Sequence, residues 1–149
     1  MLKVGDQAPD FSLLDSYGKA RTLAEFLSEG PTILYFYPID FSPVCTAQAC
    51  AMRDGFEGAT NSSVKIVGIS SQGVDSHRRF TEMHNLQFPL LADPQKSVIR
   101  AYGVDAFMGL GTRRATFLID HQAKIVNRVV SDLFVGPHRE LVAKVLGES

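Results

Sequence analysis

The chain lacks the long apolar runs and the clustered charge that would send it to a membrane or to nucleic acid. No stretch approaches the roughly 18 apolar residues that span a bilayer, and residues 1–6 lack the apolar core of a signal peptide. Net charge is −1, and the arginine pairs at 78–79 and 113–114 stand apart from any basic block. We therefore expect a cytoplasmic protein that binds neither membrane nor nucleic acid.

Cysteine is also scarce, since Cys45 and Cys50 are the only two among 149 residues. In a cytoplasmic protein, two cysteines are more often reduced or catalytic than structural. Residues five apart on a helix differ by about 140° around the axis, with Cα atoms ~8.7 Å apart. That separation exceeds the roughly 7 Å limit for a disulfide, so any bond between these two requires the start of the helix to unwind.

Cys45 is predicted near the start of that helix. Ser42 is a favoured N-cap residue, and Pro43 suits the first helical position because its missing N–H has no partner there. Cys45 then stands third in the helix, where unpaired N–H groups and the helix dipole present positive charge. This setting favours a thiolate and a more nucleophilic sulfur. We interpret Cys45 as a redox or nucleophilic residue.

One α/β domain is expected over residues 1–149, because a chain of this length that is 45% hydrophobic can bury a real core. Strands are predicted at 11–14, 21–23, 32–37, 64–70, 115–120 and 124–130. Helices are predicted from residue 43 onward and at 75–84, 98–102 and 137–146. This order indicates a central mixed β-sheet flanked by helices, with an N-terminal β-hairpin.

The spacing of apolar residues predicts which helix faces meet the core. Cys50 lies on a different face from the apolar stripe of its helix, which consists of Cys45, Ala49, Met52 and Phe56. In the helix at 75–84, Phe80 and Met83 are predicted core contacts. Arg113 and Arg114 precede a strand, and strand alternation sends them to opposite faces.

The histidines do not form a metal-binding pattern. His77 and His84 can share a helix face, but two helical histidines make a poor metal site without further ligands. We expect them to pack between helices, and we expect His121 and His138 at the surface. Phosphate-binding and nucleophile-elbow motifs are absent, so we expect no metal and no cofactor. The apolar, Gly-rich segment at 106–111 either covers a site, contacts a partner or packs on the core.

The motifs in chain order resemble those of the peroxiredoxins, which have a thioredoxin-like fold. The Pro-x-x-x-Thr/Ser-x-x-Cys signature of that family is present from Pro38 to Cys45. Residues 46–54 look like the PrxQ branch, also called bacterioferritin comigratory proteins. The likeness extends over nearly the whole chain through the stretches at 5–11, 88–93 and 114–120.

The resemblance implies a thiol-dependent peroxidase that reduces hydrogen peroxide and organic hydroperoxides. Cys45 would attack the peroxide and become a sulfenic acid, and Cys50 would resolve it as an intramolecular disulfide. Ser42 would orient the peroxide, Arg114 would stabilise the thiolate and the developing charge, and Pro38 would shield the thiolate from water. The implied reductant is thioredoxin or a similar dithiol, and the implied state is a monomer or weak homodimer.

Three positions depart from the family's commoner pattern. Ser42 stands for Thr, Val44 for the Gly of the PrxQ branch, and Gln48 for the Glu that usually follows the peroxidatic cysteine by three residues. Glutamine still accepts a hydrogen bond from an arginine, but it carries no charge. These departures bear on the local arginine network and on the rate, and not on the type of reaction.

Two other functions are compatible with paired cysteines. One is a thioredoxin-fold copper-binding assembly factor, although four residues separate Cys45 from Cys50 and such proteins normally have three. The other is a non-enzymatic thiol sensor that passes oxidation to a partner. A thioredoxin-like reductase is disfavoured because the Cys-x-x-Cys spacing is absent.

Overall fold

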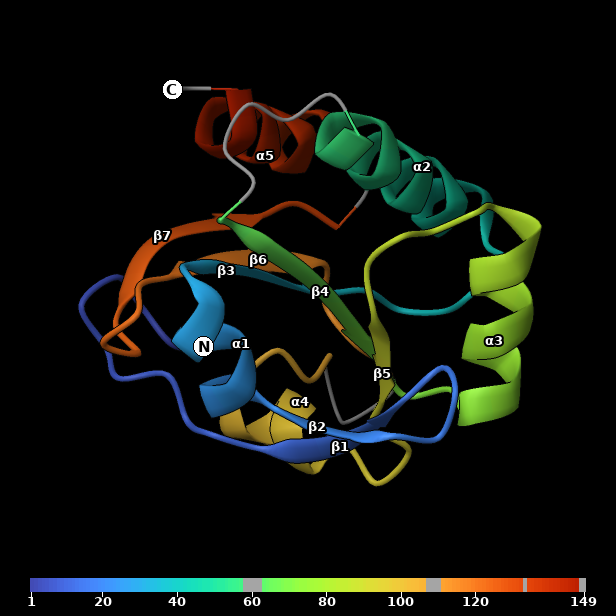
Figure 1. The fold of residues 1–149 in the computed structure, drawn as a ribbon, viewed down its shortest axis with the longest axis horizontal. Helices are drawn as coiled ribbons and strands as arrows, with labels where there is room; N and C mark the ends of the chain where they lie inside the picture. Colours follow the sequence, from blue (N-terminus) through green and yellow to red (C-terminus); the bar gives the residue numbers. More distant parts are fainter. Residues whose placement is uncertain (58–62, 107–110, 133, 148–149) are drawn as a thin grey trace.

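One mixed sheet organises the molecule (Figure 1). The computed structural model describes residues 1–57, 63–106, 111–132 and 134–147, and only the backbone of residues 56, 57, 146 and 147. Within this part of the chain, the sheet has seven strands in the order β2-β1-β5-β4-β3-β6-β7. These strands are β1 (Ser12–Asp15), β2 (Ala20–Thr22), β3 (Thr32–Phe36), β4 (Lys65–Ser70), β5 (Leu90–Ala92), β6 (Ala115–Ile119) and β7 (Ile125–Val130).

The sheet combines parallel and antiparallel pairs. β3 runs parallel to β4 and antiparallel to β6, and β4 runs parallel to β5. Antiparallel hairpins close both edges, β1 with β2 and β6 with β7. The predicted mixed sheet with an N-terminal hairpin is therefore confirmed.

Helices cover both faces of the sheet (Figure 1). The helices are α1 (Leu23–Glu29), α2 (Pro43–Glu57), α3 (Val74–Met83), α4 (Ser97–Ala101) and α5 (Gly136–Gly147). Core residues of α2, α3 and α5 pack on one face, and those of α1 and α4 pack on the other. Among the described residues, no helix is long and apolar enough to cross a membrane.

β3 is central because it is buried on both faces. Ile33 and Tyr35 point into the core cluster that holds Cys45, whereas Leu34 and Phe36 point into the opposite cluster. A strand buried in this way favours apolar side chains on both faces, which explains the apolar and aromatic run from Ile33 to Phe36. Its carboxyl end leads through residues 37–42 into α2, so the strand fixes where that helix begins.

Two elements were not predicted from the sequence, α1 and β5. Thr22 ends β2 and also caps α1, because its hydroxyl accepts the N–H of Glu25 at 3.1 Å. The strand and the helix therefore meet without a loop between them. β5 has three residues, too few for a recognisable period.

The prediction that Met83 of α3 is a core contact is wrong. Phe80 is fully buried, as expected, but Met83 is 66% exposed. Helix α3 ends at Met83, and this side chain lines a surface hollow with Phe41 and Arg79 instead of entering the core.

His138 corrects a second prediction, because it is fully buried and not at the surface. Near the start of α5, its Nε2 lies 2.9 Å from the carbonyl of Ser131, and its Nδ1 lies 2.7 Å from the hydroxyl of Thr116. A carbonyl can only accept, so Nε2 carries the proton and Nδ1 accepts from Thr116. Burial, with the nearby charge of Arg114, lowers the pKa of His138 although the Ser131 bond opposes this.

The lowered pKa of His138 predicts a pH-dependent loss of stability. Below about pH 6.5 the unfolded chain binds a proton there that the folded chain resists, so stability should fall as pH drops through this window. Chemical denaturation at a series of pH values measures this loss. His138→Gln should flatten this slope, whereas His121→Gln in the exposed turn should retain it. Equal slopes in wild type and His138→Gln would contradict the assignment.

Candidate active site at the start of helix α2

The start of α2 has the predicted capped geometry. The hydroxyl of Ser42 accepts the backbone N–H of Cys45 at 3.2 Å, and the carbonyl of Ser42 accepts the N–H of Thr46 at 2.8 Å. Pro43 is the first helical residue, so Cys45 occupies the third position as expected. Its thiol is buried, with 2% of the residue exposed.

Arg114 contacts the sulfur directly. Its Nη2 donates to Cys45 Sγ at 3.1 Å, and its Nη1 donates to Gln48 Oε1 at 2.5 Å. Its Nε donates to the carbonyl of Asp132 at 3.2 Å. Among the described residues, the guanidinium thus meets two neutral oxygens and one sulfur. A buried cation needs a compensating anion, so this environment favours Cys45 as a thiolate.

Gln48 gives the guanidinium of Arg114 a neutral partner. Its side chain is fully buried, and its amide nitrogen has no hydrogen-bond partner among the described residues. A neutral amide oxygen orients the guanidinium without cancelling its charge. A carboxylate at this position would compete with the thiolate for the same cation.

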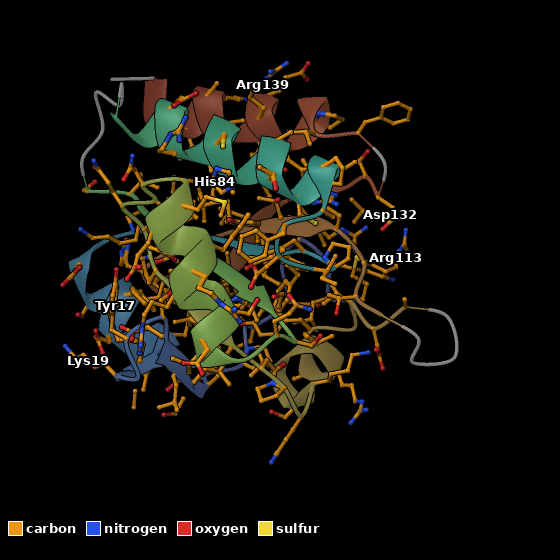
Figure 2. The ribbon with its side chains drawn as sticks, turned by 90° about the vertical axis from the view of Figure 1, so that its right-hand side faces the viewer. Tyr17, Lys19, His84, Arg113, Asp132 and Arg139 are labelled. Carbon is orange, nitrogen blue, oxygen red and sulfur yellow. The ribbon has the colours of Figure 1, made fainter. Side chains whose placement is uncertain are left out.

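The two neighbouring arginines face opposite ways, as the strand alternation predicted. Arg114 is buried, whereas Arg113 is partly exposed and pairs with Asp132 at 2.8 Å (Figure 2). Asp132 also accepts the backbone N–H of Arg114 at 3.1 Å through Oδ1. One carboxylate therefore binds the outer side chain and fixes the backbone of the inner residue.

Gln72 holds the segment between β3 and α2. Its amide nitrogen donates to the carbonyl of Pro38 at 3.2 Å, and its amide oxygen accepts the N–H of Asp40 at 3.0 Å. Phe41 has a positive φ of 69° and packs edge-on against Phe80. These contacts fix the path of the backbone from Pro38 to the helix start.

A buried polar cluster supports the same segment, and sequence reasoning missed it. The carboxylate of Asp40 bonds to His77 at 2.6 Å, Tyr37 at 2.6 Å and Ser76 at 2.8 Å. Burial acts to raise the pKa of Asp40, but the bonds from His77 and its other partners outweigh burial and lower it. His77 is therefore a hydrogen-bond partner of the segment as well as a packing residue. An aspartate in an otherwise apolar stretch was the available signal.

Cys50 lies apart from Cys45, and both are free thiols. Cys45 shares a core cluster with Ala49 and Met52, as its stripe predicted. Cys50 is partly buried, and its sulfur lies 3.9 Å from Nδ1 of His84. The side chain of Phe56 and the segment at 107–110 lie outside the described residues. Within the described part, no group of three or more His, Cys, Asp and Glu side chains is placed to hold a metal ion.

Comparison with known proteins matches the chain to one family model, to curated relatives and to a solved structure. The chain matches the model of the AhpC/TSA family over residues 4–128. It is 37% identical to peroxiredoxin Bcp of Escherichia coli K12, over 99% of this chain and 97% of that one. A putative peroxiredoxin of Mycobacterium tuberculosis H37Rv is 34% identical, over 93% and 92% of the two chains. The crystal structure of peroxidoxin BcpB from Mycobacterium tuberculosis superposes with a TM-score of 0.88 at 33% identity, covering 99% and 97%.

Removal of the Ser42 cap on α2 should lower the stability of the protein. Ser42→Ala removes the acceptor for the N–H of Cys45, and it should lower the free energy of unfolding by about 1 kcal/mol. Ser42→Thr should keep the cap and stay near wild type. Denaturant titration measures both, and an unchanged midpoint for Ser42→Ala would show that the cap contributes nothing.

Removal of the Arg114 guanidinium should lower the fraction of Cys45 that is present as thiolate. In a Cys50→Ser background, the ultraviolet absorbance of the thiolate at neutral pH should fall about tenfold in Arg114→Met. Arg113→Met is the matched control and should keep the signal, because that guanidinium pairs with Asp132 at the surface. Equal signals in the two arginine variants would refute the role of Arg114.

Proposed function

The chain belongs to the AhpC/TSA family, in the PrxQ or bacterioferritin comigratory branch of the peroxiredoxins, and on this premise we propose that it reduces hydroperoxides through a sulfenic acid on Cys45. Its peroxiredoxin relatives support thiol peroxidase chemistry. The observation that carries the assignment to Cys45 is the guanidinium of Arg114, buried and 3.1 Å from the sulfur.

In the first proposed step, the Cys45 thiolate attacks the terminal oxygen of the hydroperoxide. The S–O bond forms as the O–O bond breaks, and the leaving hydroxide or alkoxide takes up a proton. Arg114 lies where it can stabilise the charge that moves onto the oxygens. The hydroxyl of Ser42 accepts from the backbone at Cys45, which leaves its own proton free to orient the peroxide.

In the second proposed step, the sulfur of Cys50 attacks the Cys45 sulfenic acid. A disulfide forms and water leaves, so the protein has given two electrons to the peroxide. The helix must first unwind, because its geometry keeps these two residues too far apart. Thioredoxin or a similar dithiol would then reduce the disulfide by thiol–disulfide exchange.

Thiol counting and intact mass after one equivalent of hydrogen peroxide test this function. Wild type should lose both thiols rapidly and become lighter by two hydrogens. Cys50→Ser should stop at the sulfenic acid, and Cys45→Ser should not react. Slow, non-stoichiometric loss of thiols in wild type would overturn the proposal.

Turnover assays and copper analysis of the same protein preparation separate the competing functions. A peroxidase should turn over repeatedly with thioredoxin, its reductase and NADPH. A thiol sensor would oxidise once and fail to turn over. Stoichiometric copper on the purified protein, without peroxide turnover, would indicate a copper-binding assembly factor instead.

A further inference from the structure

The end of helix α3 places a histidine beside the second cysteine. His84 is the C-cap residue of α3, and its Nδ1 lies 3.9 Å from Cys50 Sγ. Arg53, one turn further along α2 than Cys50, donates from Nη1 to the carbonyl of His84 at 2.7 Å. Helix α2 thus contacts both the ring and the backbone of His84. Figure 2 shows His84 at the end of α3 nearest to α2.

The ring of His84 is held from the other side as well. Phe80 packs against it edge-on, with ring centroids 5.1 Å apart and the planes at 71°. The backbone N–H of His84 donates to the carbonyl of Phe80 at 3.2 Å, and Asn85 turns the chain with a positive φ of 51°. The contact with Cys50 therefore comes from a fixed helix end and not from a free surface side chain.

Cys50 lacks the features that favour a thiolate at Cys45. It lies in the interior of α2, where backbone N–H groups bond to carbonyls of the preceding turn. Arg114 binds the other sulfur. Resolution nevertheless requires a nucleophilic sulfur, because the thiolate and not the thiol attacks. Some group has to remove the Cys50 proton, and among the described residues His84 is the polar side chain in contact with that sulfur.

We propose that His84 is a catalytic residue of the resolving step, where it accepts the thiol proton of Cys50. This inference rests on the proposed peroxidase function. The S–H bond of Cys50 breaks as Nδ1 of neutral His84 takes the proton, before unwinding separates the two residues. The thiolate then attacks the Cys45 sulfenic acid, the S–O bond breaks, and the leaving hydroxide is neutralised to water by the proton that His84 releases.

The charged and titratable groups around this pair are compatible with the transfer. On α2, Arg53 bonds to Asp54 at 3.0 Å, so its charge near His84 is partly offset. On α3, Glu82 is exposed. On β3, Tyr35 is fully buried, and burial raises its pKa well above the usual value and keeps it neutral. Beside this sulfur, His84 is therefore the described side chain placed to take the proton, because its Nδ1 lies 3.9 Å from Cys50 Sγ.

Alkylation of Cys50 tests the proton transfer without any peroxide. In a Cys45→Ser background, iodoacetamide should modify Cys50 about tenfold more slowly at neutral pH in His84→Asn and in His84→Gln. At strongly alkaline pH, where the thiol ionises unaided, the rates should converge. His121→Asn, in the exposed turn, is the matched control and should leave the rate unchanged. Equal neutral-pH rates with and without His84 would overturn the proposal.

A single turnover separates this inference from the function on which it rests. With Cys45 present, His84→Asn should form the sulfenic acid at the wild-type rate but close the disulfide about tenfold more slowly at neutral pH. An unchanged rate of disulfide closure would refute the role of His84 alone. Failure of wild type to form any sulfenic acid would refute the peroxidase function itself.

Discussion

The candidate site depends on one buried contact, between the guanidinium of Arg114 and the sulfur of Cys45. A cation removed from water is costly unless an anion compensates it, and its other partners here are neutral oxygens. The helix start adds positive charge on the same sulfur. The glutamine at position 48 then has a physical meaning, because its amide oxygen positions the arginine without placing a second anion beside the sulfur.

The proposed reaction places opposite demands on the start of α2. Attack on peroxide needs Cys45 held by the Ser42 cap and by the segment that Gln72 clamps. Disulfide formation needs the same turns to open, since Cys50 is out of reach on an intact helix. The cap contributes only about 1 kcal/mol, so it can order the site and still break when the start of the helix unwinds. The buried bonds of Asp40 keep the preceding segment in place.

Local patterns predicted much of the fold, whereas contacts between distant elements were beyond the sequence. Strand runs, the Ser42 cap and the opposed arginines follow from spacing along the chain. The burial of His138 depends on how α5 packs against the sheet, so the sequence pattern wrongly predicts it at the surface. Met83 is wrongly predicted in the core, because α3 ends at this residue. The bonds from His77 to Asp40 and from His84 to Cys50 join α3 to other segments. No spacing within one element encodes such pairs.

We propose that position at the helix start and contact with Arg114 make Cys45 the attacking sulfur. Rapid quenching of wild type after peroxide, with a reagent that traps sulfenic acids, followed by peptide mapping, tests this most directly. The earliest adduct should be on Cys45, and it should decline as the disulfide forms. An earliest adduct on Cys50, with Cys45 unmodified, would contradict it.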